Sequence, residues 1–67
     1  MRSTRGTTHH HLQEPDTGLY YTTRPDGEPA LTPRRATATA FHTSALAIEY
    51  ATLRLAGQAC ELVRVTA

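Results

Sequence analysis

The pattern of apolar and polar positions predicts one clear helix, over residues 43–57. Alanine and leucine, which favour helices, recur through this segment, and Thr43 or Ser44 can serve as its N-cap. Gly57 is well placed to end the helix, because glycine adopts the left-handed conformation at little cost. At about 100° per residue, five mostly small residues lie on one face of the helix, where they suit close packing on a sheet. This stripe consists of Ser44, Ala47, Ile48, Ala51 and Leu55.

A second apolar stripe on the same segment consists of Leu46, Tyr50 and Leu53. It is rotated from the first stripe by more than a quarter turn at the helical period. One interpretation makes both stripes a single wide core face. The other makes the second stripe a surface for a partner chain, because exposed apolar patches mark interaction sites. We take Leu46, Tyr50 and Leu53 as the predicted partner-binding residues.

A β-hairpin is predicted ahead of the helix. Residues 19–24 are rich in β-favouring side chains and alternate between two faces. The sequence Pro25-Asp26-Gly27 that follows is a strong turn signal. A short second strand over residues 28–31 completes the hairpin, and its Pro29 places it at an edge, because proline cannot donate to a ladder.

Two further strands are expected on either side of the helix. A single helical turn is predicted first, since Thr32 and Pro33 resemble an N-cap followed by proline. Residues 37–41, TATAF, then alternate as a short third strand does. Residues 59–65, ACELVRV, are apolar on both faces, which favours a central position in the sheet.

The order hairpin, short strand, helix, strand predicts an α+β fold: a small antiparallel sheet of three to four strands with one helix packed on one face. In this outline, residues 18–66 are similar to the small orphan α+β proteins common in phages and mobile elements. Residues 1–17 are polar, lack apolar periodicity and end in turn residues. They predict a flexible tail, followed by one domain over residues 18–67.

Length and composition narrow the class of protein. A chain of 67 residues buries only roughly 60% of its unfolded surface, so its stability calls for a disulfide, a metal or a partner. A single cysteine excludes an internal disulfide. The net charge of +1 excludes a strong basic or acidic field. No apolar run suits a signal peptide or a membrane span, and we expect a cytoplasmic protein.

Metal binding and catalysis find little support in the sequence. The run His9, His10 and His11 invites a metal, but neighbouring histidines on a flexible chain point in different directions. His42 and Cys60 are the one available base–nucleophile pair, and the cysteine lies in a strand expected to be buried. We therefore expect no cofactor, no metal and no enzymatic activity.

Two hypotheses for function remain. The first is a protein-binding module that occupies the surface of another protein or of a second copy. Its extension, by analogy with anti-CRISPR proteins, is a phage or mobile-element inhibitor of a host defence complex. The alternative is a nucleic-acid-binding accessory protein in which Arg24, Arg34 and Arg35 contact phosphates.

Overall fold

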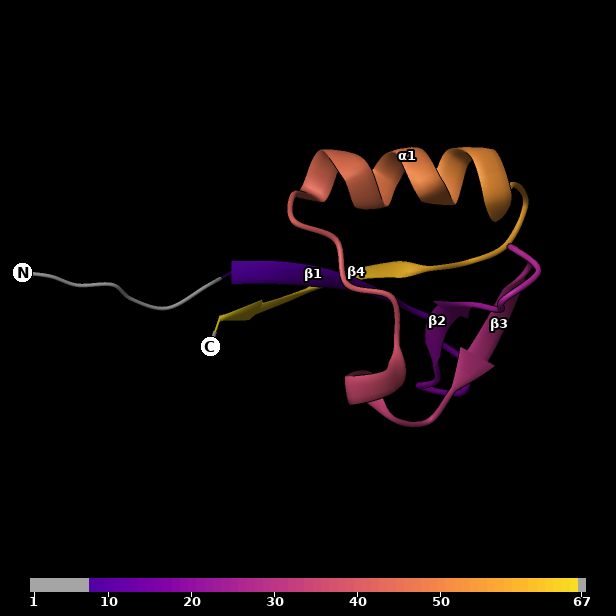
Figure 1. Cartoon of the computed structure of the whole chain (residues 1–67), viewed down its shortest axis with the longest axis horizontal. Coiled ribbons are helices and arrows are strands. Elements are labelled where there is room, and N and C mark those ends of the chain that lie inside the picture. The colour runs from indigo at the N-terminus through magenta and orange to yellow at the C-terminus, as the bar shows by residue number, and fades with distance from the viewer. Residues whose placement is uncertain (1–7, 67) are drawn as a thin grey trace, which may run out of the picture.

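The computed structural model describes residues 8–66, which form one antiparallel sheet with one α-helix. The sheet has the strand order β3-β2-β1-β4. Helix α1 covers one face, and the 3₁₀ helix η1 lies on the opposite side of the sheet (Figure 1). This arrangement confirms the predicted α+β fold class. The elements are β1 (Thr8–Gln13), β2 (Tyr20–Thr23), β3 (Pro29–Thr32), η1 (Arg35–Thr37), α1 (Ser44–Arg54) and β4 (Glu61–Thr66).

Strand β1 is central in the sheet, so the predicted flexible tail over residues 1–17 is wrong for residues 8–13. β1 pairs along its whole length with β4 and at its far end with β2. Its Leu12 is 2% exposed and belongs to the core. The folded unit thus begins ahead of residue 18, and residues 1–7 lie outside the described residues. Pairing on both sides satisfies the backbone of a segment whose side chains are mostly polar.

The turn between β1 and β2 uses the residues that the sequence marks as turn formers. Gly18 adopts a φ of 76°, and its N–H donates to the carbonyl of Glu14 at 2.9 Å. The Glu14 carboxylate accepts hydrogen bonds from the backbone and the hydroxyl of Thr17, at 2.7 and 2.8 Å. These two bonds lower the pKa of Glu14.

The segment after η1 crosses the sheet and does not form the strand predicted over residues 37–41. The N–H of Thr39 donates to the carbonyl of Tyr21 at 3.2 Å. Phe41 exchanges two backbone hydrogen bonds of 2.8 Å with His10. The chain therefore passes between β1 and β2 on its way from η1 to α1 (Figure 1). Only isolated backbone bonds form, because the segment crosses from one side of the sheet to the other beyond the Gln13–Tyr20 pair that joins β1 and β2.

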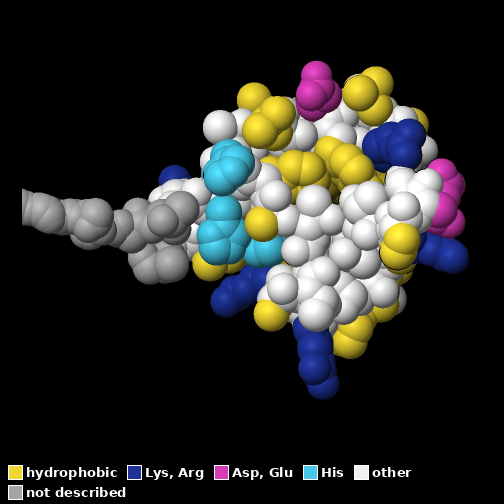
Figure 2. Space-filling view, in the orientation of Figure 1, with side chains coloured by type: hydrophobic (Ala, Val, Ile, Leu, Met, Phe, Trp, Pro, Cys, Tyr) yellow, Lys and Arg dark blue, Asp and Glu magenta, His cyan; other side chains and the backbone are white. Residues whose placement is uncertain are grey.

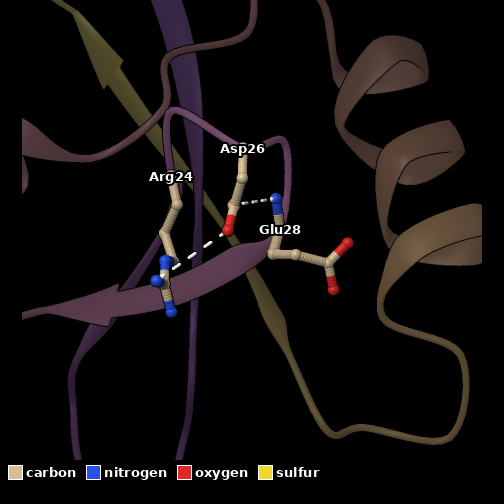
Figure 3. Close-up of polar contacts among 3 residues, drawn as sticks. All are labelled: Arg24, Asp26 and Glu28. Atoms are coloured by element: carbon tan, nitrogen blue, oxygen red, sulfur yellow. Dashed lines mark hydrogen bonds and ion pairs between the residues drawn. The ribbon is translucent and has the colours of Figure 1, made fainter.

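The hairpin of β2 and β3 follows the prediction closely. Gly27 takes a φ of 89°, and the Asp26 carboxylate accepts a hydrogen bond of 3.0 Å from the N–H of Glu28. Arg24 lies 3.8 Å from the same carboxylate (Figure 3). β3 is an edge strand, as Pro29 predicts. A single helical turn is present nearby as η1, but it begins two residues later than predicted, with Arg34 and not Thr32 at its N-cap.

Strand β4 is the other edge, and the predicted central position for residues 59–65 is wrong. Within residues 8–66, β4 pairs only with β1. Its Leu62 faces α1, whereas Val63 and Val65 point to the side of η1. Both faces of β4 thus carry apolar residues because a layer lies on each side of the sheet, although the described part of the chain adds no strand beyond β4.

The core lies between α1 and the sheet. Its buried apolar residues are Leu12, Tyr21, Ala47 and Leu55. Ala47 is fully buried, because the small residue lets the helix approach the strands closely. The hydroxyl of Tyr21 donates to the carbonyl of Ala59 at 3.2 Å and so holds the connection between α1 and β4. At the other end of the helix, Thr43 is the N-cap, and its hydroxyl accepts a bond of 3.1 Å from the N–H of Leu46.

Candidate partner-binding surface

The predicted partner-binding stripe lines a groove along one side of α1, which we call the Leu46 face. Leu46 is 47% exposed and Leu53 is 72% exposed. Figure 2 shows hydrophobic side chains along α1 and beneath it, with acidic and basic side chains among them. The remaining residues that line the groove are Ala40, Phe41, His42, Glu49, Tyr50 and Arg54.

Tyr50 belongs partly to the monomer and forms the floor of the Leu46 face. Its ring lies 5.4 Å from the ring of Phe41, and both side chains are half-buried against the core. Its hydroxyl oxygen is 3.3 Å from the Thr23 hydroxyl. Leu46 and Leu53 are therefore the members of the stripe that project, while Tyr50 supports them. Phe41 also lines this groove and is not among the predicted partner-binding residues, although an aromatic residue next to the start of the helix is a signal for it.

A second groove runs on the other side of α1, between the helix and β4; we call it the β4 groove. Ile48 lines it and is 56% exposed, so the prediction that it packs in the core with Ala47 is wrong. Helical periodicity gives the direction of Ile48 correctly, but no strand of the described residues, 8–66, lies beyond β4 to cover it. Leu62, which is 42% exposed, lines the same groove. Apolar surface thus lies on both sides of the helix.

The three arginines of the nucleic-acid hypothesis lie at opposite ends of β3. Arg24 precedes the turn into β3, where it faces the Asp26 carboxylate. Arg34 and Arg35 follow the far end of the strand. Four strand residues separate the two positions by about 13 Å. Because a phosphate backbone is bound by a continuous basic surface, this separation does not favour the hypothesis.

Strand alternation divides the histidine run between the two faces of the sheet. His9 and His11 share the η1 side, with ring centroids 5.0 Å apart, and His10 lies on the α1 side. The Nδ1–H of His11 donates to the carbonyl of Thr39 at 2.9 Å. Burial lowers the pKa of His11; the charges of His9 and Arg35 act in the same direction, and the bond to Thr39 opposes them.

The residues considered for metal binding and catalysis do not form a cluster. No group of three or more metal-ligating side chains is found within residues 8–66. Cys60 is half-buried in the β4 groove, whereas His42 is exposed and lines the Leu46 face on the other side of the helix. In the same range of residues, no helix has the length and apolarity needed to cross a bilayer.

No protein-family model matches this chain, and neither a curated protein nor a solved structure is significantly similar to it.

Proposed function

We propose that the protein is a non-enzymatic binding module, and that the Leu46 face of α1 occupies an apolar surface on a partner protein. One observation carries the proposal: two leucines, 47% and 72% exposed, project from a groove floored by aromatic rings. Solvent-exposed leucines that adjoin one another over aromatic side chains are typical of a contact surface. The core gains little from either leucine, since the buried set lies on the opposite side of the helix.

The geometry also suits a helix-in-groove contact. Leu46, Tyr50 and Leu53 recur at the spacing of successive helical turns, which is how a helix presents anchors to a partner. Glu49 and Arg54 lie at the border of the Leu46 face, where polar side chains form the rim of an interface. The partner is expected to offer an apolar cleft with a polar rim.

The test compares matched pairs of substitutions on the same helix. The double variant Leu46→Gln/Leu53→Gln removes the projecting leucines and keeps Tyr50, which the monomer uses. The control Ala45→Gln/Thr52→Gln changes two exposed helix positions away from the Leu46 face. Each protein is used to capture partners from the native host, and any candidate is then purified and titrated. We expect the first variant to lose at least about tenfold in affinity, or about 1.4 kcal/mol, and the control to bind like the wild type.

Circular dichroism on the same samples separates folding from binding. If both variants are folded and bind equally well, the Leu46 face is not the contact surface. Unfolding of the first variant would assign both leucines to the monomer. A steep loss of affinity with salt would instead favour the nucleic-acid hypothesis, because phosphate contacts release counterions. The hypothesis that the partner is a host defence complex stays a prediction that identification of the captured protein would test.

A further inference from the structure

The two edges of the sheet differ in how they are protected. An edge strand presents unpaired backbone groups, and proteins blunt such edges with proline, lysine or a covering segment. β3 contains Pro29, whose nitrogen carries no hydrogen. β4, with the sequence ELVRVT, contains no proline, and its two charged residues, Glu61 and Arg64, have opposite signs, so they do not repel a second strand as a row of like charges would. It is thus the edge at which a further strand can add.

The hydrogen-bonding direction of β4 follows from its neighbour. His10 exchanges its backbone bonds with Phe41, on the side of β1 that faces away from β4. Because the direction alternates along a strand, the residues of β1 that point toward β4 are the odd-numbered ones. In β4, the residues opposite even-numbered positions of β1 therefore direct their N–H and C=O groups outward. These residues are Leu62, Arg64 and Thr66.

The β4 groove lies directly beside this edge. Ile48 and Leu62 leave about half of their side chains exposed there, and the groove ends at the C-terminus of α1, next to Leu55 and Gly57. The last carbonyls of a helix carry partial negative charge, and Arg54, the basic residue in the last turn of α1, donates its hydrogen bond to the Gly27 carbonyl in the β2–β3 turn. A partner that adds a strand to β4 would thus meet apolar side chains first and a negative helix end beyond them.

Arg64 supplies the matching charge on the same strand. Its side chain projects on the α1 side of the sheet, because Arg64 lies opposite His10. It is exposed and makes no ion pair with another residue in the described part of the chain. When two β4 strands pair antiparallel about a two-fold axis at Val63, Arg64 of one copy lies opposite Leu62 of the other. Its aliphatic stem then covers Leu62, and its guanidinium approaches the helix end of the second copy.

The symmetric register at Val63 satisfies several requirements at once. Residues 61–65 of one β4 strand lie opposite residues 65–61 of the other, so nearly the whole strand is paired. No charged side chain lies opposite one of the same sign. A register centred on Arg64 would set two guanidinium groups side by side, which is unfavourable. The contact is reciprocal, as a two-fold interface requires.

We propose that β4 is the seam of a homodimer, in which the β4 strands of two copies pair about Val63 and join the two sheets into one. Both α1 helices then lie on the same face, and each Leu46 face stays open.

Cross-linking through engineered cysteines tests the seam. In a Cys60→Ala background, Val63→Cys places two thiols at the two-fold axis. This is a non-hydrogen-bonded pair, with Cα atoms about 4.5 Å apart, within the range that a disulfide spans. The control Val65→Cys has the same residue type, strand and face. Its two copies would lie about 13 Å apart along the strands, too far to bridge.

Both variants are incubated with oxidised glutathione and separated on a denaturing gel with and without reductant. We expect a reducible dimer for Val63→Cys and monomer for Val65→Cys, with light scattering showing a dimer for the wild type. The proposal is overturned if the two variants cross-link equally, if only Val65→Cys does, or if the wild type is a monomer at all concentrations. Adding Leu46→Gln/Leu53→Gln to the Val63→Cys variant should leave the cross-link intact. Loss of the cross-link in a folded protein would place the dimer contact on the Leu46 face instead.

Discussion

His9, His10 and His11 are adjacent in sequence, yet strand β1 gives them different surroundings. His11 is 4% exposed and lies beneath the segment that follows η1, with its ring 6.1 Å from that of Tyr20. The hydrogen bond to the Thr39 carbonyl satisfies one ring nitrogen and fixes the side chain that the strand turns inward. A buried imidazole of this kind is favoured in its neutral form, because burial penalises the charge.

The stability of the protein should consequently depend on the protonation of His11. Its folded-state pKa lies below the ordinary value of 6.5, so the unfolded chain binds the proton more readily as the pH falls below that value. The contribution of neutral His11 is complete above about pH 6.5 and is lost as the pH falls toward the folded-state pKa. We expect His11→Gln, whose amide can donate to Thr39, to flatten this part of the profile in urea unfolding. The exposed control His42→Gln should keep the wild-type slope, and equal slopes for all three proteins would contradict the assignment.

Among the helices and strands, the sequence pattern predicts those whose structure is determined by residues close to them in the sequence. The helix follows from its apolar period and from the Thr43 cap, and the β2–β3 hairpin follows from the Asp26-Gly27 turn. The sequence pattern does not predict β1, because Leu12 is its one aliphatic residue. The segment is a strand because it pairs with neighbours on both sides. The exposure of Ile48 cannot be predicted from the sequence of the helix either, since it depends on where the sheet ends.

The candidate surface could be predicted only in part for the same reason. The period of α1 identifies Leu46, Tyr50 and Leu53 as one stripe, which lines one groove in the structure. It cannot show that Tyr50 is partly covered by Phe41, because that contact joins the helix to a crossing segment. The register of β1 with β4 is likewise a long-range property, and it decides the direction in which Arg64 points.

Removal of β1 should abolish the fold. β1 lies between β2 and β4, and Leu12 fills the core against α1. A chain that starts at Thr17 loses this strand and leaves β4 without the neighbour with which it pairs. We expect no cooperative thermal transition for that chain in circular dichroism. The milder change Leu12→Ala should stay folded and lose about 2–5 kcal/mol of stability. A Thr17 chain that unfolds like the wild type would show that β1 is dispensable.

For the molecule as a whole, the buried core is small and the pairing that closes it is long-range. Among residues 8–66, four apolar residues are buried, and the first strand pairs with the last, from Thr8 opposite Thr66 to Gln13 opposite Glu61. Domains of this length bury only roughly 60% of their unfolded surface, so association with a second copy would add to the stability of the folded state. The β4 seam would extend the sheet without covering either Leu46 face.

Coupled association and unfolding make the urea midpoint depend on protein concentration. If two folded copies separate as they unfold, each increase of about tenfold in concentration adds about 1.4 kcal/mol to the free energy of unfolding per dimer. We expect the wild-type midpoint to rise accordingly. Arg64→Glu should remove the dependence, because it brings a negative charge to the negative helix end of the second copy. The control Arg24→Glu makes the same change of charge at an exposed position in the β2–β3 hairpin, which β1 separates from β4, and its midpoint should depend on concentration as that of the wild type does. A wild-type midpoint that is independent of concentration would mean that the core stabilises the monomer alone and that β4 is not a dimer seam.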